Sequence, residues 1–104
     1  MITVTTVSDT EGKILELRVE GHSGFAESGE DIVCASVSST VWMVINGIEK
    51  QSLAELSYKE SDGFVDCIIS KKREIGADVL LSSFIMFIEE LSMQYGDFLK
   101  LVQK

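Results

Sequence analysis

The fold is decided by residues 13–48, which read KILELRVEGHSGFAESGEDIVCASVSSTVWMVINGI. Apolar and charged residues alternate over Lys13–Glu20, a period of two that is typical of a β-strand with one face in solvent. From Val33 the apolar residues recur every three or four positions, which predicts a helix with one buried stripe. Asp31 is a favourable N-cap residue for that helix. We therefore expect a strand, a glycine-bearing loop over Gly21–Glu30, and a helix after it.

The rest of the chain adds elements of the same two kinds. In chain order we expect strands over Ile2–Ser8 and Lys13–Glu20, a helix from Asp31 to Gln51, strands over Leu53–Lys59 and Phe64–Ser70, a helix from about Gly76 to Tyr95, and a tail over Phe98–Val102 that could form a short edge strand. The sequence Ser61-Asp62-Gly63 is turn-forming and joins the second pair of strands. The order ββαββα predicts an α+β fold, in which two helices pack on a mostly antiparallel or mixed sheet.

Length and composition indicate one domain, residues 1–104, that is large enough to fold without disulfide or metal support. We expect no cofactor and no metal site. Its content of 45% apolar and 25% charged residues is ordinary for a globular protein. The formal charge of -8 argues against a direct nucleic-acid partner, because such a surface needs clustered Lys and Arg and the sequence has one short basic cluster, Lys71-Lys72-Arg73. The acidity would attract a basic partner, or it could serve only to keep the protein in solution.

The sequence shows no feature that would direct the chain to a membrane. It starts with strand-like alternation at Met1–Val4, and no apolar run reaches the roughly 20 residues that a membrane span needs. We therefore expect a cytoplasmic protein in which Cys34 and Cys67 are free thiols. Cys67 alternates with Val65 and Ile69, so it is expected in the core.

The second expected helix carries more apolar residues than one face of a sheet needs. Its main stripe consists of Ala77, Leu80 or Leu81, Phe84, Ile88, Leu91 and Tyr95. Four further apolar residues lie outside that stripe: Ile85, Met86, Phe87 and Met93. Two interpretations stay open, a homodimer interface on this helix or a helix that is buried on all sides.

His22 and Cys34 are the best candidates for chemistry. Cys34 falls in the first turn of a helix, where free backbone N–H groups stabilise a thiolate and could bind an oxyanion. His22 is the one histidine, and imidazole can act as general base and then as general acid near neutral pH. Cys34 could equally be a small buried side chain. Asp31 could cap the helix or orient the imidazole, and Ser38, one turn after Cys34, could hydrogen-bond near the site.

Residues 21–38 resemble the ribosomal-processing cysteine protease family, Prp. The family pattern is Gly-His-Ala-Gly, a short glycine-bearing loop, then Asp, Val-Cys-Ala and a nearby Ser. The matching residues are Gly21, His22, Gly24, Gly29, Asp31, Val33, Cys34, Ala35 and Ser38. Ser23 replaces the usual Ala and makes the loop slightly more polar. The chain length and the order of elements also fit the family.

The resemblance implies an endopeptidase with Cys34 as nucleophile and His22 as base. It also implies a homodimer that removes the N-terminal extension of ribosomal large-subunit protein twenty-seven, a basic substrate cut after an aromatic-containing apolar motif. The loop that would border the peptide substrate is expected to be mobile, because it is rich in glycine and has few large apolar side chains to anchor it. Its residues include Gly21, Ser23, Gly24, Phe25 and Gly29. A non-catalytic ribosome-assembly factor, and a thiol enzyme for acyl transfer or redox chemistry on a small molecule, remain as alternatives.

Overall fold

The computed structural model describes residues 1–27 and 29–104. Its elements are β1 (Ile2–Ser8), β2 (Ile14–Glu20), α1 (Ile32–Lys50), β3 (Ala54–Ser61), β4 (Phe64–Arg73), α2 (Ile75–Gln94) and β5 (Leu99–Gln103). The predicted order ββαββα is confirmed, and the tail does form a final strand. Strand β4 runs three residues beyond its predicted end at Ser70.

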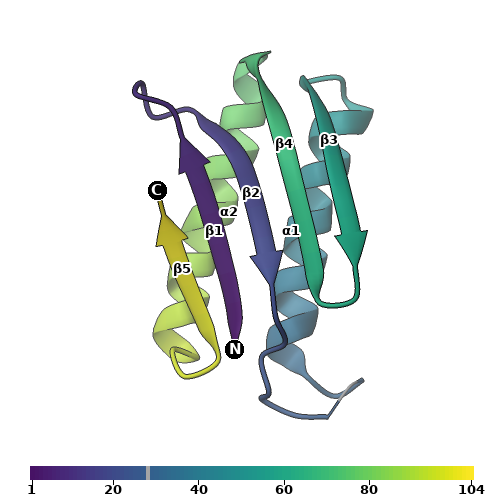
Figure 1. Cartoon of the computed structure of the whole chain (residues 1–104), viewed down its shortest axis with the longest axis vertical. Coiled ribbons are helices and arrows are strands. Elements are labelled where there is room, and N and C mark those ends of the chain that lie inside the picture. The colour runs from purple at the N-terminus through teal and green to yellow at the C-terminus, as the bar shows by residue number, and fades with distance from the viewer. Residues whose placement is uncertain (28) are drawn as a thin grey trace.

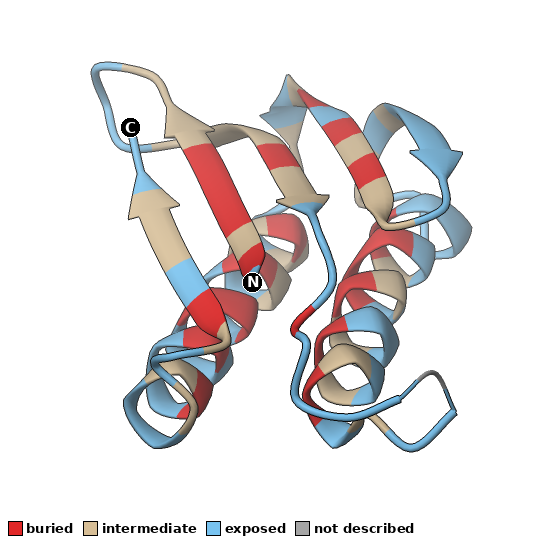
Figure 2. Cartoon of the chain, turned by 60° about the horizontal axis from the view of Figure 1, so that its bottom comes forward, coloured by how far each residue is buried: buried red, intermediate tan, exposed pale blue. Residues whose placement is uncertain are grey.

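The strands form one mixed sheet in the order β3-β4-β2-β1-β5. Neighbours are antiparallel except β1 and β5, which run parallel at one edge. Both helices lie on the same face of this sheet, α1 behind β3 and β4, and α2 running obliquely behind β2 and β1 toward β5 (Figure 1). The view in Figure 2 shows the same two layers from below. The α+β class is therefore confirmed, with a core between one sheet and two helices.

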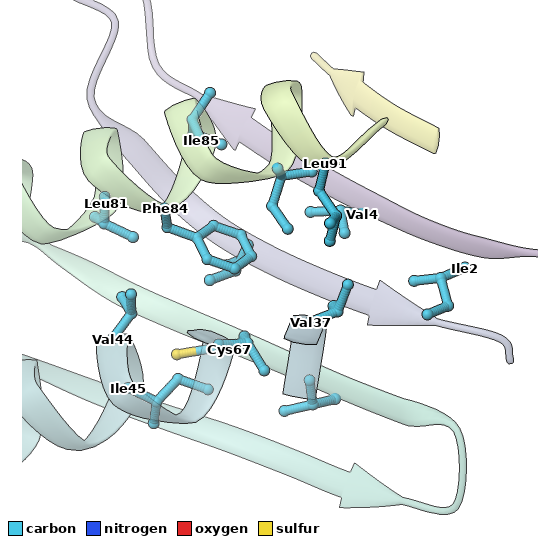
Figure 3. Packing of buried hydrophobic residues seen from close by; sticks show 14 of the residues in the cluster. Ile2, Val4, Val37, Val44, Ile45, Cys67, Leu81, Phe84, Ile85 and Leu91 are labelled. Carbon is cyan, nitrogen blue, oxygen red and sulfur yellow. The ribbon is translucent and has the colours of Figure 1, made fainter. Parts of the chain in front are cut away.

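The predicted apolar stripes line this core. The apolar residues at helical spacing in α1 are buried: Val33, Val37, Val41, Val44 and Ile48. So are Ala77, Leu81, Phe84, Ile88 and Leu91 of α2. Figure 3 shows Phe84 directed into the layer between helices and sheet, in the same cluster as Cys67 of β4. Cys67 is 1% exposed, so its predicted place in the core is confirmed.

The apolar residues outside the predicted stripe of α2 differ in exposure. Ile85 is only 8% exposed, so the buried face of the helix is wider than that stripe. Met86 and Met93 do face solvent, with 67% and 82% of their surfaces exposed. The helix is therefore not buried on all sides, and an exposed apolar strip remains on it.

Helix α1 is long and apolar enough to cross a membrane, judged by length and composition alone. Its buried residues lie on one side, however, and pack in the core. The hydroxyls of Ser36 and Thr40 donate to helix carbonyls one turn earlier, at 2.7 Å and 2.6 Å. One-sided burial with satisfied hydroxyls is the pattern of a core helix in a layered protein.

The basic cluster is used by the fold. Arg73 has a buried side chain that donates to the carbonyl oxygen of Ile14 at 2.7 Å and pairs with Asp78 at 3.3 Å. Lys71 lies 3.5 Å from a carboxylate oxygen of Asp9 in the β1–β2 turn. Two of the three basic side chains therefore have acidic partners within the domain.

Candidate active site

The sheet register places His22 beside the β3–β4 turn. Strands β2 and β4 pair Glu20 with Phe64, and two more residues of the same register bring His22 opposite Asp62. The backbone follows this register, since the N–H of Gly21 donates to the carbonyl oxygen of Gly63 at 2.8 Å. The imidazole Nε2 lies 3.7 Å from Asp62 Oδ2. An acidic side chain thus lies near the imidazole.

Backbone on both sides holds His22 while its ring stays accessible. On the β1 side, the amino group of Met1 donates to the His22 carbonyl oxygen at 2.6 Å. On the β4 side, Gly63 lies against the ring, because a Cβ at that position would sit 2.7 Å from His22 Nε2. The His22 side chain is nevertheless 64% exposed. A fixed backbone with an open ring suits a residue that exchanges protons with a bound molecule.

Cys34 is the third residue of α1, and Asp31 caps the helix as predicted. Asp31 Oδ1 accepts the backbone N–H of Cys34 at 2.9 Å, and its Oδ2 accepts the hydroxyl of Ser23. Burial opposes ionisation of Asp31, but the hydrogen bonds from Ser23 and Cys34 outweigh it and lower the pKa of Asp31 to about 2. Both carboxylate oxygens of Asp31 therefore bind the helix start and the loop, while a carboxylate oxygen of Asp62 lies within 4 Å of the imidazole.

The sulfur of Cys34 receives a hydrogen bond from the loop. The backbone N–H of Ser23 donates to Cys34 Sγ at 3.3 Å, so a loop amide points at the sulfur. The N–H of Cys34 itself is taken by Asp31, so it is not free for an oxyanion as the sequence had led us to expect. Two hydrogen bonds therefore hold Cys34 in place: its backbone N–H is bound by the Asp31 cap, and its sulfur is bound by the Ser23 amide.

Two pockets meet at the residues that carry the chemistry. Both are lined by His22, Cys34, Ser38 and Asp62. The first has a volume of about 290 Å³ and apolar walls that include Ile2, Val19, Val37, Val41, Trp42, Phe64 and Val65. The second has a volume of about 580 Å³ and is bordered by the loop, through Gly24, Ala26 and Gly29, and by Asp31 and Ala35. An extended chain laid from one pocket to the other would pass over Cys34.

The described part of the loop has more anchors than its sequence indicates. Ser23 is 3% exposed, and Phe25 packs edge-on against Tyr95 and Phe98, with ring centroids 5.5 Å and 5.3 Å apart. The expectation that little holds the loop is therefore wrong for these two residues. Phe25 turns toward the end of α2, whereas Gly21, Gly24 and Gly29 line the pockets. Ser28 lies outside the described residues.

Sequence reasoning missed Asp62, Gly63 and Trp42. The first two were identified only as part of a turn, although the register of β2 and β4 brings that turn to the histidine. Trp42 lies one helical turn after Ser38 and stands edge-on to Tyr58, with ring centroids 5.2 Å apart. The available signal was its place, as the one tryptophan of the sequence, on the same helix as Cys34.

The two thiols are expected to differ in reactivity. Burial, with the charges of Asp66 and Glu49, raises the pKa of Cys67 to about 11. Its thiolate therefore forms only as the pH rises toward that value, and below pH 7 only on the order of one molecule in 10⁴ carries it. Brief iodoacetamide treatment at pH 6.5, read by peptide mass spectrometry, should label Cys34 at least about tenfold more than Cys67. Preferential labelling of Cys67 would reverse this assignment.

Comparison with known proteins gives a consistent result along the whole chain. A family model described as cysteine protease Prp matches residues 1–100. The ribosomal processing cysteine protease Prp of Staphylococcus aureus (strain Mu50) is 24% identical over 106 residues, with 100% of both chains covered. The protein of that name from Bacillus subtilis (strain 168) is 29% identical over 107 residues, covering 96% of this chain and 95% of its own.

The fold is also shared with a solved structure. The crystal structure of an essential ribosomal processing protease Prp from S. aureus, in complex with a covalently linked product peptide, matches with a TM-score of 0.93. That chain is 24% identical, and the match covers 100% of both chains. The order of strands and helices derived above is therefore that of a known protein architecture.

Proposed function

This chain belongs to the cysteine protease Prp family, and on that premise we propose that it is an endopeptidase that removes the N-terminal extension of ribosomal large-subunit protein twenty-seven. We assign Cys34 as nucleophile and His22 as general base and acid. One observation carries the assignment: the two residues line both pockets, so a peptide that spans the pockets meets thiol and imidazole together.

The proposed reaction is acyl transfer through the thiol. His22 accepts the proton of the Cys34 thiol, and the sulfur attacks the scissile carbonyl carbon to form a tetrahedral oxyanion. Collapse of that intermediate breaks the C–N bond, leaves a thioester on Cys34, and releases an amine that receives the proton from His22. Water, deprotonated by the same imidazole, then hydrolyses the thioester. Asp62 supports the imidazolium, and the N–H of Ser23 supports the thiolate.

We assign the first pocket to the aromatic side chain of the substrate motif. Its walls are apolar and include the ring of Trp42, a partner suited to edge or face contact with another ring. Glu60 and Asp62 also line it and are exposed, so a basic residue near the aromatic one finds acidic partners. The second pocket, next to the loop, then takes the other side of the scissile bond.

We further propose a cytoplasmic homodimer that makes no direct nucleic-acid contact. Val79, Met86 and Met93 recur every seven residues on α2 and are each more than half exposed, as expected of a strip that a second copy would cover. Two free cysteines fit a reducing compartment.

The function is tested by incubating the purified protein with ribosomal large-subunit protein twenty-seven in its extended form. Mass spectrometry should find a new N-terminus directly after the aromatic motif. Stable binding without cleavage would favour the assembly factor instead. Turnover of thioesters or disulfides with the extension left intact would favour a thiol enzyme for small molecules.

The net charge of -8 should appear in substrate capture. Long-range attraction acts on association, and it weakens as the Debye length falls from about 10 Å at 0.1 M salt to about 3 Å at 1 M. We expect kcat/KM for the full-length basic substrate to fall about three- to tenfold over that range. A short neutral peptide across the cleavage site should change little, and kcat should stay constant for both. Equal salt dependence for the two substrates would assign the acidity to solubility.

A further inference from the structure

Ser23 is buried in a loop whose neighbouring residues are exposed. It is 3% exposed, while His22 and Gly24 on either side of it face solvent. A hydroxyl removed from water needs hydrogen-bond partners. The Ser23 hydroxyl donates to Asp31 Oδ2 and accepts the backbone N–H of Phe25 at 3.1 Å. The hydroxyl thus has a hydrogen-bond acceptor in the helix cap and a donor in the loop backbone.

Two routes connect Ser23 to Cys34. The backbone N–H of Ser23 donates directly to Cys34 Sγ at 3.3 Å. The hydroxyl of Ser23 reaches the same residue through Asp31, whose other oxygen accepts the Cys34 N–H at 2.9 Å. These hydrogen bonds form a closed loop of contacts from Ser23 through Asp31 to Cys34 and back to Ser23. The bond from the hydroxyl to Asp31 therefore fixes the direction in which the Ser23 N–H points.

We infer that Ser23 is a positioning residue of the thiol site, whose hydroxyl anchors the loop to the Asp31 cap and thereby aims the Ser23 N–H at the sulfur of Cys34. The inference rests on the proposed function of Cys34 as nucleophile. It extends the site beyond the residues that line the pockets, because Ser23 is buried and is not part of either pocket lining.

The hydroxyl acts on the thiol through the loop backbone. It holds the Ser23 N–H donor at the sulfur, and a donor favours the charged form of its acceptor. Its bond to Asp31 ties the loop to the residue that caps the helix at Cys34. Removing the hydroxyl releases this tie and also leaves the Phe25 N–H without this acceptor.

The test is Ser23→Ala, a change to the residue that the family pattern has at this position and therefore one expected to fold. The second-order rate of Cys34 alkylation at pH 6.5 should fall about fivefold, and kcat for peptide cleavage should fall by a similar factor with KM within about twofold. The matched control is Thr6→Ala, which removes another buried hydroxyl, 1% exposed, from the half of β1 that leads to the first hairpin. This control should lose stability and keep both rates.

Three results would overturn the inference. One is alkylation of Ser23→Ala at the wild-type rate. Another is slowed cleavage with unchanged alkylation, which would move the hydroxyl's role from the thiol to the substrate. The third is an equal loss of reactivity in Thr6→Ala. Alkylation is read without any substrate, so a wild-type protein that cleaves no ribosomal extension would defeat the proposed function and still leave the comparison at Ser23 decisive.

Discussion

Replacing Cys34 with alanine or serine is expected to lower kcat/KM for the ribosomal extension by at least about 10³-fold while the protein stays folded. Alanine has no nucleophile, and a serine hydroxyl is not activated by surroundings that suffice for a thiol. The fold should tolerate both changes, since Cys34 is partly exposed and its bond to Asp31 uses the backbone N–H that any residue retains. Cleavage is followed by mass spectrometry, and thermal unfolding is measured in parallel.

The matched control is Cys67→Ala. That thiol is 1% exposed in the core, so its loss should cost about 1–2 kcal/mol of stability and leave cleavage intact. His22→Ala should lose nearly as much activity as Cys34→Ala, because it removes the imidazole that lines both pockets together with Cys34 and is assigned as the proton acceptor. More than about a tenth of wild-type activity in either Cys34 variant would remove Cys34 as the nucleophile.

Local patterns predict the elements of this fold well, because each signal lies within one element. The period of apolar residues defines the helices, and Asp31 marks the start of α1 from its own position in the chain. Sheet order is different, since it depends on pairing between distant segments. Strand β4 pairs with β2 as well as with β3, and β5 runs parallel to β1, which no local pattern states. The burial of Ile85, outside the predicted stripe, is likewise not a local feature, because it depends on what packs over that side of α2.

The residues of the candidate site likewise fall into those that local patterns predict and those that depend on contacts between distant segments. A strand end and a helix start are local features, so the sequence identifies His22 and Cys34. Asp62 enters only through the register between β2 and β4, which brings a distant turn to the imidazole. Ser23 is a polar residue in a glycine-rich loop, and a pattern cannot tell that its hydroxyl is turned inward to Asp31.

Gly21→Ala is expected to combine a loss of stability of about 2–4 kcal/mol with a loss of cleavage. Gly21 has a φ of +96°, a conformation that favours glycine. A Cβ there would also lie 2.2 Å from the carbonyl oxygen of Met1, so strand β1 or the end of β2 would have to move. His22 is the next residue, and its backbone is bonded to Met1, so the movement would displace the imidazole from the pockets.

Gly12→Ala serves as the control that separates backbone strain at positive φ from the steric clash with Met1. Gly12 has a similar φ of +85° in the first hairpin turn, but nothing lies within 4 Å of its added Cβ. It should therefore show the backbone strain alone, about 1 kcal/mol in urea unfolding, with full cleavage. Equal stabilities for the two variants would mean that the close approach to Met1 does not matter. Gly21→Ala could also keep full kcat despite its lower stability. In that case the position of His22 would not depend on the close approach between Gly21 and Met1, and the register argument that places the imidazole in the site would fail.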